Sequence, residues 1–155
     1  MKKIFSFSIL FIFILSLTSC FKEFDKTFDE KTLVEFQDAI TKTKAVGKTF
    51  PIISYTSSAD TTVRAQVNLV GAQRSTDLQV NVSVDAANTT AENGGYEIKP
   101  LVFPANSSIA MLEIVLKKVA ASSGKSVTLT VQLDGNGSDV LPSENFKKLG
   151  FGFKH

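Results

Sequence analysis

Four segments of the chain place apolar and polar residues at alternating positions. Residues 63–69, 78–84 and 127–133 carry Val, Leu or Ala at every second position, with Arg, Gln, Asn, Ser or Thr between them. Near the end of the chain, Leu149, Phe151 and Phe153 are separated by single glycines. Successive side chains of a β-strand point to opposite faces of a sheet. The alternation therefore predicts four strands that bury one face in a shared core.

Four further apolar segments complete the predicted set of strands, at residues 33–36, 50–55, 96–103 and 109–116. Pro51 near the start of the second segment indicates an edge strand, and Pro100 interrupts the third. Clusters of turn-forming residues separate the segments. Seven to eight short strands predict an all-β fold, an immunoglobulin-like antiparallel β-sandwich over residues 31–155. Residues 32–40 also fit one face of a helix, which is the alternative for that segment.

The segment from Ile109 to Leu116 is apolar on both faces, with Glu113 as the exception. Strands of this kind are covered on both sides. One interpretation is a strand in the middle of a sheet whose outer side is covered by a loop or by the N-terminal tether. The other is that Ile109 and Met111 form a surface that binds a partner.

The first 20 residues have the three parts of a bacterial lipoprotein leader. Lys2 and Lys3 precede an apolar run of 14 residues from Ile4 to Leu17, too short to span a bilayer. The next residues, Leu17-Thr18-Ser19-Cys20, resemble a lipobox, in which the cysteine becomes the mature N-terminus and carries diacylglycerol. This predicts a signal peptide at residues 1–19, lipidation of Cys20, a tether at residues 20–30, and anchoring of the protein to the outer membrane through the lipid.

The amino-acid composition excludes several classes of function. Without the two leader lysines, 15 basic residues balance 15 acidic ones, so no nucleic-acid-binding surface is expected. The chain has one Cys, one His and no Trp. His155 is the last residue, where we expect it to be mobile and a poor base, and the carboxylates are scattered singly. We therefore predict no enzymatic activity, no catalytic residue, no cofactor and no metal site.

A family resemblance enters at residues 90–108. Thr90-Ala91-Glu92-Asn93-Gly94-Gly95-Tyr96-Glu97-Ile98, followed by Val102-Phe103-Pro104-Ala105-Asn106-Ser107-Ser108, resembles a pattern of Calx-β-like and related immunoglobulin-like domains. Uncharacterised Bacteroidota surface lipoproteins of the kind associated with polysaccharide-utilisation systems carry it behind a lipobox. The resemblance implies a β-sandwich in a surface assembly. Calx-β domains hold calcium with clustered acids, but Lys117-Lys118 stand where an acidic pair is expected.

Two polar motifs remain. The loop from Asp134 to Asp139 begins like a calcium loop but lacks the glycine and glutamate that would complete an EF-hand-like site, which favours a simple connection between strands. Asp60-Thr61-Thr62 resembles an O-glycosylation site of Bacteroidota periplasmic proteins, with Thr61 as the acceptor.

Together these features predict a non-enzymatic accessory or interaction module of a cell-envelope assembly, with an envelope protein or a polysaccharide as partner. The domain would lie on the surface or on the periplasmic face of the outer membrane. Two alternatives are a glycan-binding surface lipoprotein with a site near Tyr96 and a calcium-stabilised adhesion domain. Sugar platforms are scarce, because Tyr55 and Tyr96 are the only residues of the Trp and Tyr classes.

Overall fold

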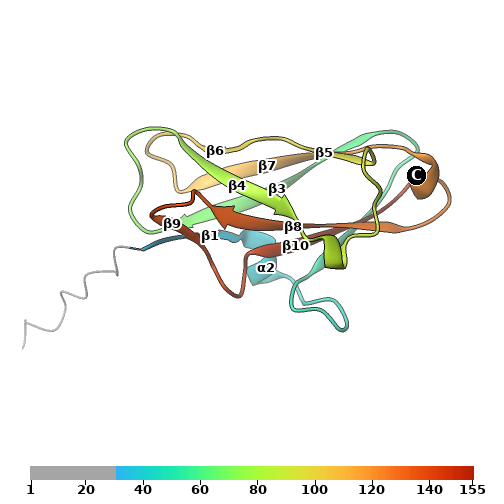
Figure 1. The fold of residues 1–155 in the computed structure, drawn as a ribbon, viewed down its shortest axis with the longest axis horizontal. Helices are drawn as coiled ribbons and strands as arrows, with labels where there is room; N and C mark the ends of the chain where they lie inside the picture. Colours follow the sequence, from blue (N-terminus) through green and yellow to red (C-terminus); the bar gives the residue numbers. More distant parts are fainter. Residues whose placement is uncertain (1–30) are drawn as a thin grey trace, which may run out of the picture.

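The structure is a computed structural model that describes residues 31–155. These residues form two five-stranded sheets packed face to face (Figure 1). The first sheet contains, in spatial order, β5 (Tyr96–Ile98), β7 (Ile109–Leu116), β3 (Thr61–Val70), β1 (Thr32–Phe36) and β9 (Val140–Pro142). The second contains β2 (Ile52–Thr56), β10 (Lys148–Lys154), β8 (Val127–Gly135), β4 (Leu78–Val84) and β6 (Leu101–Phe103). The predicted all-β sandwich is confirmed.

Three short helices connect the strands: α2 (Gln37–Thr41), η2 (Ala86–Asn88) and η3 (Ala120–Ser122). The segment with two interpretations, residues 32–40, is therefore mainly strand, with helix only from Gln37. Within residues 31–155, no helix has the length and apolar character needed to cross a membrane. The predicted leader, Cys20 and the tether lie outside the described residues.

The core lies between the two sheets and consists of the residues that the alternation selected. Val63, Ala65, Val67 and Leu69 of β3 are buried, and so are the inward residues of β8 and β10. Burying a large aliphatic or aromatic side chain stabilises a fold by about 1.5–3 kcal/mol. Four phenylalanines are fully buried, Phe36, Phe103, Phe151 and Phe153, and make this core the main source of stability.

The structure has ten strands, more than the seven to eight predicted. Pro100 lies between β5 and β6, and these two halves of the expected strand belong to different sheets. The tenth strand, β9, has three residues inside a segment that reads as a loop. Pro51 directly precedes β2, which is an edge strand as predicted.

Two strand pairs depart from the predicted antiparallel arrangement. β1 runs parallel to β9, and β2 runs parallel to β10. The antiparallel prediction rests on strands that are joined by short turns. Each parallel pair instead joins strands from opposite ends of the sequence, and a long connection does not fix their relative direction.

Strand β7 lies inside the first sheet, between β5 and β3, as one interpretation of its two apolar faces required. Its inward residues, Ala110, Leu112, Ile114 and Leu116, are buried. Among the described residues, its outer side is only partly covered. Ile109 and Met111 are 52% and 47% exposed.

Candidate functional site

The outer face of the second sheet is covered where β10 carries glycine. Gly150 and Gly152 are the outward-facing residues of β10, and both are buried. A Cβ atom on Gly150 would lie 2.7 Å from Cγ1 of Ile52. The backbone N–H of Gly150 donates to the carbonyl of Pro51 at 3.0 Å. Because Gly150 and Gly152 lack side chains, the side chain of Ile52, on the neighbouring strand β2, lies against the outer face of β10.

The segment before β2, residues 42–51, forms a projecting loop beside this contact (Figure 1). The N–H of Ala45 donates to the carbonyl of Phe50, and the N–H of Lys48 donates to that of Ala45, both at 3.0 Å. Phe50 is 4% exposed and fixes the base of the loop. Lys48 Nζ donates to Asn88 Oδ1 at 2.7 Å and links the loop to η2.

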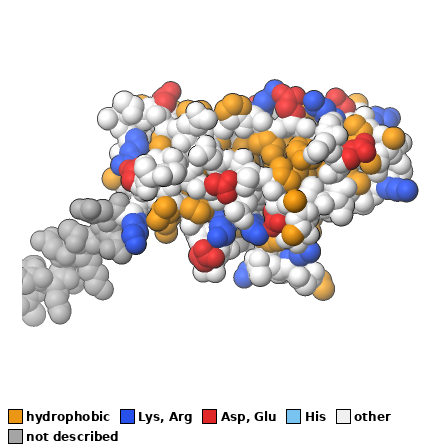
Figure 2. Space-filling model, in the orientation of Figure 1, with side chains coloured by type: hydrophobic (Ala, Val, Ile, Leu, Met, Phe, Trp, Pro, Cys, Tyr) orange, Lys and Arg blue, Asp and Glu red, His pale blue; other side chains and the backbone are white. Residues whose placement is uncertain are grey.

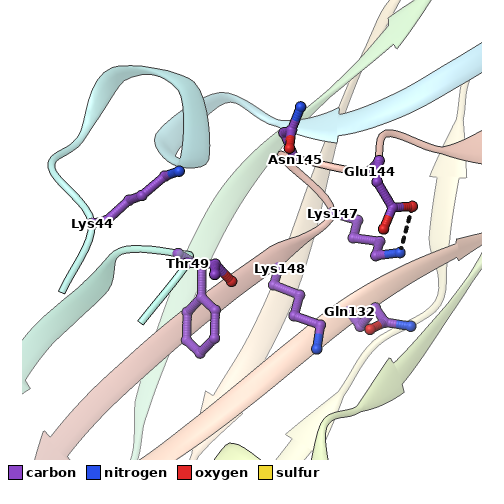
Figure 3. Close-up of a pocket in the computed structure, with 8 residues that line it drawn as sticks. Lys44, Thr49, Gln132, Glu144, Asn145, Lys147 and Lys148 are labelled. Atoms are coloured by element: carbon purple, nitrogen blue, oxygen red, sulfur yellow. Dashed lines mark hydrogen bonds and ion pairs between the residues drawn. The ribbon is translucent and has the colours of Figure 1, made fainter. Parts of the chain in front are cut away.

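A pocket of about 400 Å³ lies between this loop and the segment that leads into β10 (Figure 3). One wall comes from the loop and the other from residues 144–148, with Gln132 of β8 contributing to the base. The lining residues are Lys44, Thr49, Phe50, Gln132, Glu144, Asn145, Lys147 and Lys148. In Figure 3, Lys44 extends from the loop toward Asn145 across the opening. Figure 2 shows Lys or Arg side chains along this lower edge of the molecule.

The positive charges of the pocket differ in how firmly they are paired. Lys148 Nζ lies 2.8 Å from Asp85 Oδ2, and the Asp85 side chain is only 10% exposed. The hydrogen bond from Lys148, together with one from Asn88, holds the pKa of Asp85 below its ordinary value. Lys147 pairs at 3.1 Å with Glu144, whose side chain is 86% exposed. Lys44 has no ion-pair partner among residues 31–155.

This chemistry is suited to holding a polar ligand. The lining supplies ammonium groups, two side-chain amides, a hydroxyl and one carboxylate, all of which form hydrogen bonds. Phe50 is too deeply buried to offer an aromatic face. In the described part of the chain, no group of three His, Cys, Asp or Glu side chains is placed to hold a metal ion.

The residues singled out from the sequence lie away from this pocket. Thr61 is the first residue of β3, and its hydroxyl donates to the carbonyl of Ala59 at 3.1 Å. Ile109 and Met111 lie on the other sheet. Tyr96 is half-buried against the core.

The polar loop after β8 is held together by its own side chains. Asp139 accepts hydrogen bonds from Asn136 and Ser138, at 2.8 and 3.0 Å, and pairs with Arg74. The hydrogen bonds from Asn136 and Ser138 are the main reason that the pKa of Asp139 is lowered. Asp134 accepts instead from Gln132 at 3.0 Å. The carboxylates of Asp134 and Asp139 thus accept hydrogen bonds from different partners.

The expectation that His155 is mobile is wrong. Its N–H donates to the carbonyl of Ser122 at 2.8 Å, and its Nδ1 lies 3.0 Å from Ser122 Oγ. Its ring packs edge-on against Phe153. Ser122 is completely buried, so a substrate does not reach its hydroxyl. The contact fastens the end of β10 to η3.

Sequence reasoning missed the pocket, although the sequence carries a weak signal of it. Residues 39–59 contain three lysines and no acidic residue, and Lys147 and Lys148 are adjacent. Neither feature forms a motif with fixed spacing. The sequence does not show that β2 pairs with β10, and this pairing is what brings the two lysine-bearing segments together.

The two sheets form a β-sandwich whose fold is similar to that of Calx-β domains. The apo form of a Calx CBD1 domain superposes with a TM-score of 0.50 at 9% identity, over 81% of this chain and 99% of that one. The chain belongs to the family described as Domain of unknown function (DUF4843), which matches residues 30–149.

Two Bacteroides structures share the fold. One, from Bacteroides ovatus ATCC 8483, is provisionally described as a carbohydrate binding protein. Its TM-score is 0.52 at 16% identity, covering 78% of this chain and 36% of that one. The other is a two-domain protein of unknown function from Bacteroides fragilis NCTC 9343, with a TM-score of 0.50 at 10% identity over 80% and 45% of the two chains. This chain therefore spans less than half of either. No curated protein matches the sequence.

Proposed function

We propose that this protein is a non-enzymatic accessory domain of a bacterial cell envelope that binds a saccharide in the pocket between residues 42–51 and 144–148. The observation that carries the proposal is the pocket itself. Its volume of about 400 Å³ falls within the range of small-ligand sites. Its lining is dominated by side chains that donate hydrogen bonds, which suits a ligand rich in hydroxyl groups.

The structural likeness to the Bacteroides ovatus protein, described as carbohydrate-binding, supports this choice of ligand. Of the neighbours that share the fold, one is described as a carbohydrate binding protein and another as a Calx CBD1 domain, and neither of these two as an enzyme. The pocket lining has a single carboxylate, that of Glu144, whereas hydrolysis of a saccharide generally uses a pair of carboxylates.

Isothermal titration of the purified protein with a panel of neutral and acidic oligosaccharides tests the proposal. Binding should be lost when Gln132 and Asn145 are both replaced by Ala, since both amides line the pocket, Asn145 in the wall formed by residues 144–148 and Gln132 at the base (Figure 3). Asn81→Ala, an exposed amide outside this pocket, is the matched control. Failure of every saccharide to bind at millimolar concentration would remove the proposal.

We also propose that the domain is anchored to the outer membrane by diacylglycerol on Cys20, through the lipobox Leu17-Thr18-Ser19-Cys20. Two acyl chains give stable membrane attachment, whereas one gives only reversible binding. Metabolic labelling with a fatty-acid analogue should mark the wild type and not Cys20→Ala. Protease treatment of intact and lysed cells then separates surface from periplasmic placement. Labelling of the Cys20→Ala protein would contradict the assignment.

A second candidate function, interaction with an envelope protein, is favoured by one observation. Ile109 and Met111 are both half-exposed and lie next to each other on the outer face of β7. Replacing both with Lys should abolish co-purification of a stoichiometric partner while the melting temperature changes little. Unfolding of the double variant would show that the two side chains are core instead. An unchanged set of partners would remove this surface from consideration.

A further inference from the structure

We infer that the ligand of the pocket is acidic: a saccharide that carries carboxylate or sulfate groups. The inference rests on the proposed function and adds the chemical class. Three lysines and one glutamate line the pocket, so positive charge is in excess. No aromatic face is open to the pocket, because Phe50 is 4% exposed. Affinity for a neutral sugar usually uses such a face, so charged groups have to supply the affinity here.

Lys147 is placed to accept a ligand carboxylate in exchange for its present partner. Its side chain is 21% exposed and therefore held at the pocket wall, whereas that of Glu144 is 86% exposed. Exposed ion pairs contribute little to stability because water screens both charges. A ligand carboxylate that is bound in the pocket can therefore displace the Glu144 carboxylate at little cost.

Lys148 has a different role, because its charge is already neutralised by Asp85 at 2.8 Å. Asn88 donates to the same Asp85 oxygen at 2.8 Å and accepts from Lys48 at 2.7 Å. This network ties the loop to the sheet and fixes Lys148 in place. Lys44 and Lys147 are consequently the residues expected to contact the acid group of the ligand, one from each wall (Figure 3).

The test compares a saccharide with its uncharged derivative. An oligogalacturonate and the fully methyl-esterified oligomer of the same length share one sugar backbone, and the ester methyl group removes the charge of each carboxylate. A sulfated dextran and dextran form a second pair, which separates sulfate from carboxylate as the source of the charge. We expect an acidic member to bind at least about tenfold more tightly than its neutral counterpart, with affinity that falls as salt is raised from about 50 to about 200 mM, because salt screens the attraction between the charges.

Single substitutions show which residues cause the preference for an acidic saccharide. Lys147→Gln and Lys44→Gln should each weaken binding of the acidic saccharide by roughly tenfold, the loss expected for one charge-assisted hydrogen bond. Lys125→Gln, on an exposed loop outside the pocket, is the matched control and should have no effect. Glu144→Gln should strengthen binding by about two- to fivefold, because it removes the competing carboxylate. If Glu144 only stabilised the fold, Glu144→Gln would not increase the affinity for the acidic saccharide.

Equal binding of the acidic and esterified forms would overturn the inference and leave the proposed function intact. Binding of neutral saccharides alone would have the same meaning. If no saccharide of either kind bound, both proposals would fall together. A melting temperature within a few degrees of the wild type for each variant ensures that a loss of affinity reports on the pocket.

Discussion

The contact between β10 and the chain before β2 makes a sharp prediction about Gly150. Adding a Cβ atom there places it 2.7 Å from Ile52 Cγ1 and 3.4 Å from both Ile52 Cβ and the Pro51 carbonyl. Cγ1 is bonded to the branched Cβ of Ile52, so it moves away only if this side chain leaves its χ1 rotamer or the backbone of β2 shifts. Overpacking of this kind costs about 1–3 kcal/mol. Alanine is favoured over glycine in a strand by roughly 0.5–1 kcal/mol, so Gly150→Ala should destabilise the fold by about 1–2 kcal/mol.

Gly152 provides the matched control on the same face of the same strand. A Cβ atom there would lie 3.4 Å from Ile52 Cγ2, which is ordinary van der Waals contact. Gly152→Ala should therefore leave stability unchanged or raise it by up to about 1 kcal/mol. With a urea slope of about 2 kcal/mol/M, the midpoint of unfolding should fall by about 0.5–1 M for Gly150→Ala and not for Gly152→Ala.

A double-mutant cycle with Ile52→Ala identifies the contact. This substitution removes Cγ1, so that Gly150→Ala should cost at least about 1 kcal/mol less in that background. Equal unfolding midpoints for Gly150→Ala and the wild type would refute the reasoning. A cost that is the same with and without the Ile52 side chain would refute it as well.

Three further outcomes are expected. Asp85→Asn should destabilise the fold by about 1–2 kcal/mol at pH 7, because Lys148 loses its charged partner. Folding lowers the pKa of Asp85, so this difference in stability is present above pH 3.8 and should disappear as the pH falls through the lower pKa of the folded state. Urea titrations at pH 7 and below pH 3 measure the difference in stability. Thr130→Val should cost about 1–2 kcal/mol and speed hydrogen exchange in residues 85–90, since the buried Thr130 hydroxyl donates to the carbonyl of Asn88 at 2.8 Å; unchanged exchange would contradict this. The melting temperature should be the same in calcium and in chelator, because Asp139 is engaged by Asn136 and Ser138, and a rise of several degrees in calcium would restore the adhesion alternative.

The strands of the fold could be predicted because their information is local. Alternation at residues 63–69, 127–133 and 149–153 selects the buried face of each strand without reference to any other segment. The pairing of β1 with β9 and of β2 with β10 depends on segments far apart in the sequence, and no local pattern records it. The predicted antiparallel arrangement was therefore incomplete at both places.

The candidate site could not be predicted for the same reason. Lys44 and Lys147 are separated by most of the domain, and each in isolation reads as an ordinary surface lysine. The sequence does show Gly150 and Gly152 at outward positions of a strand. Their consequence, that the Ile52 side chain lies against the outer face of β10, depends on knowing that β2 pairs with β10.

The parallel pairing of β2 with β10 has a consequence for the order in which the chain folds. Within residues 31–155, β10 is the only neighbour of β2 in its sheet, and it is the last of the strands along the chain. Contacts between distant segments form slowly, because the intervening chain loses entropy before they are made. As the chain is synthesised from its N-terminus, β2 has no neighbour in its sheet until residues 148–154 emerge. The two segments that form the pocket walls lead into these two strands, so the pocket is complete only when β2 and β10 have paired.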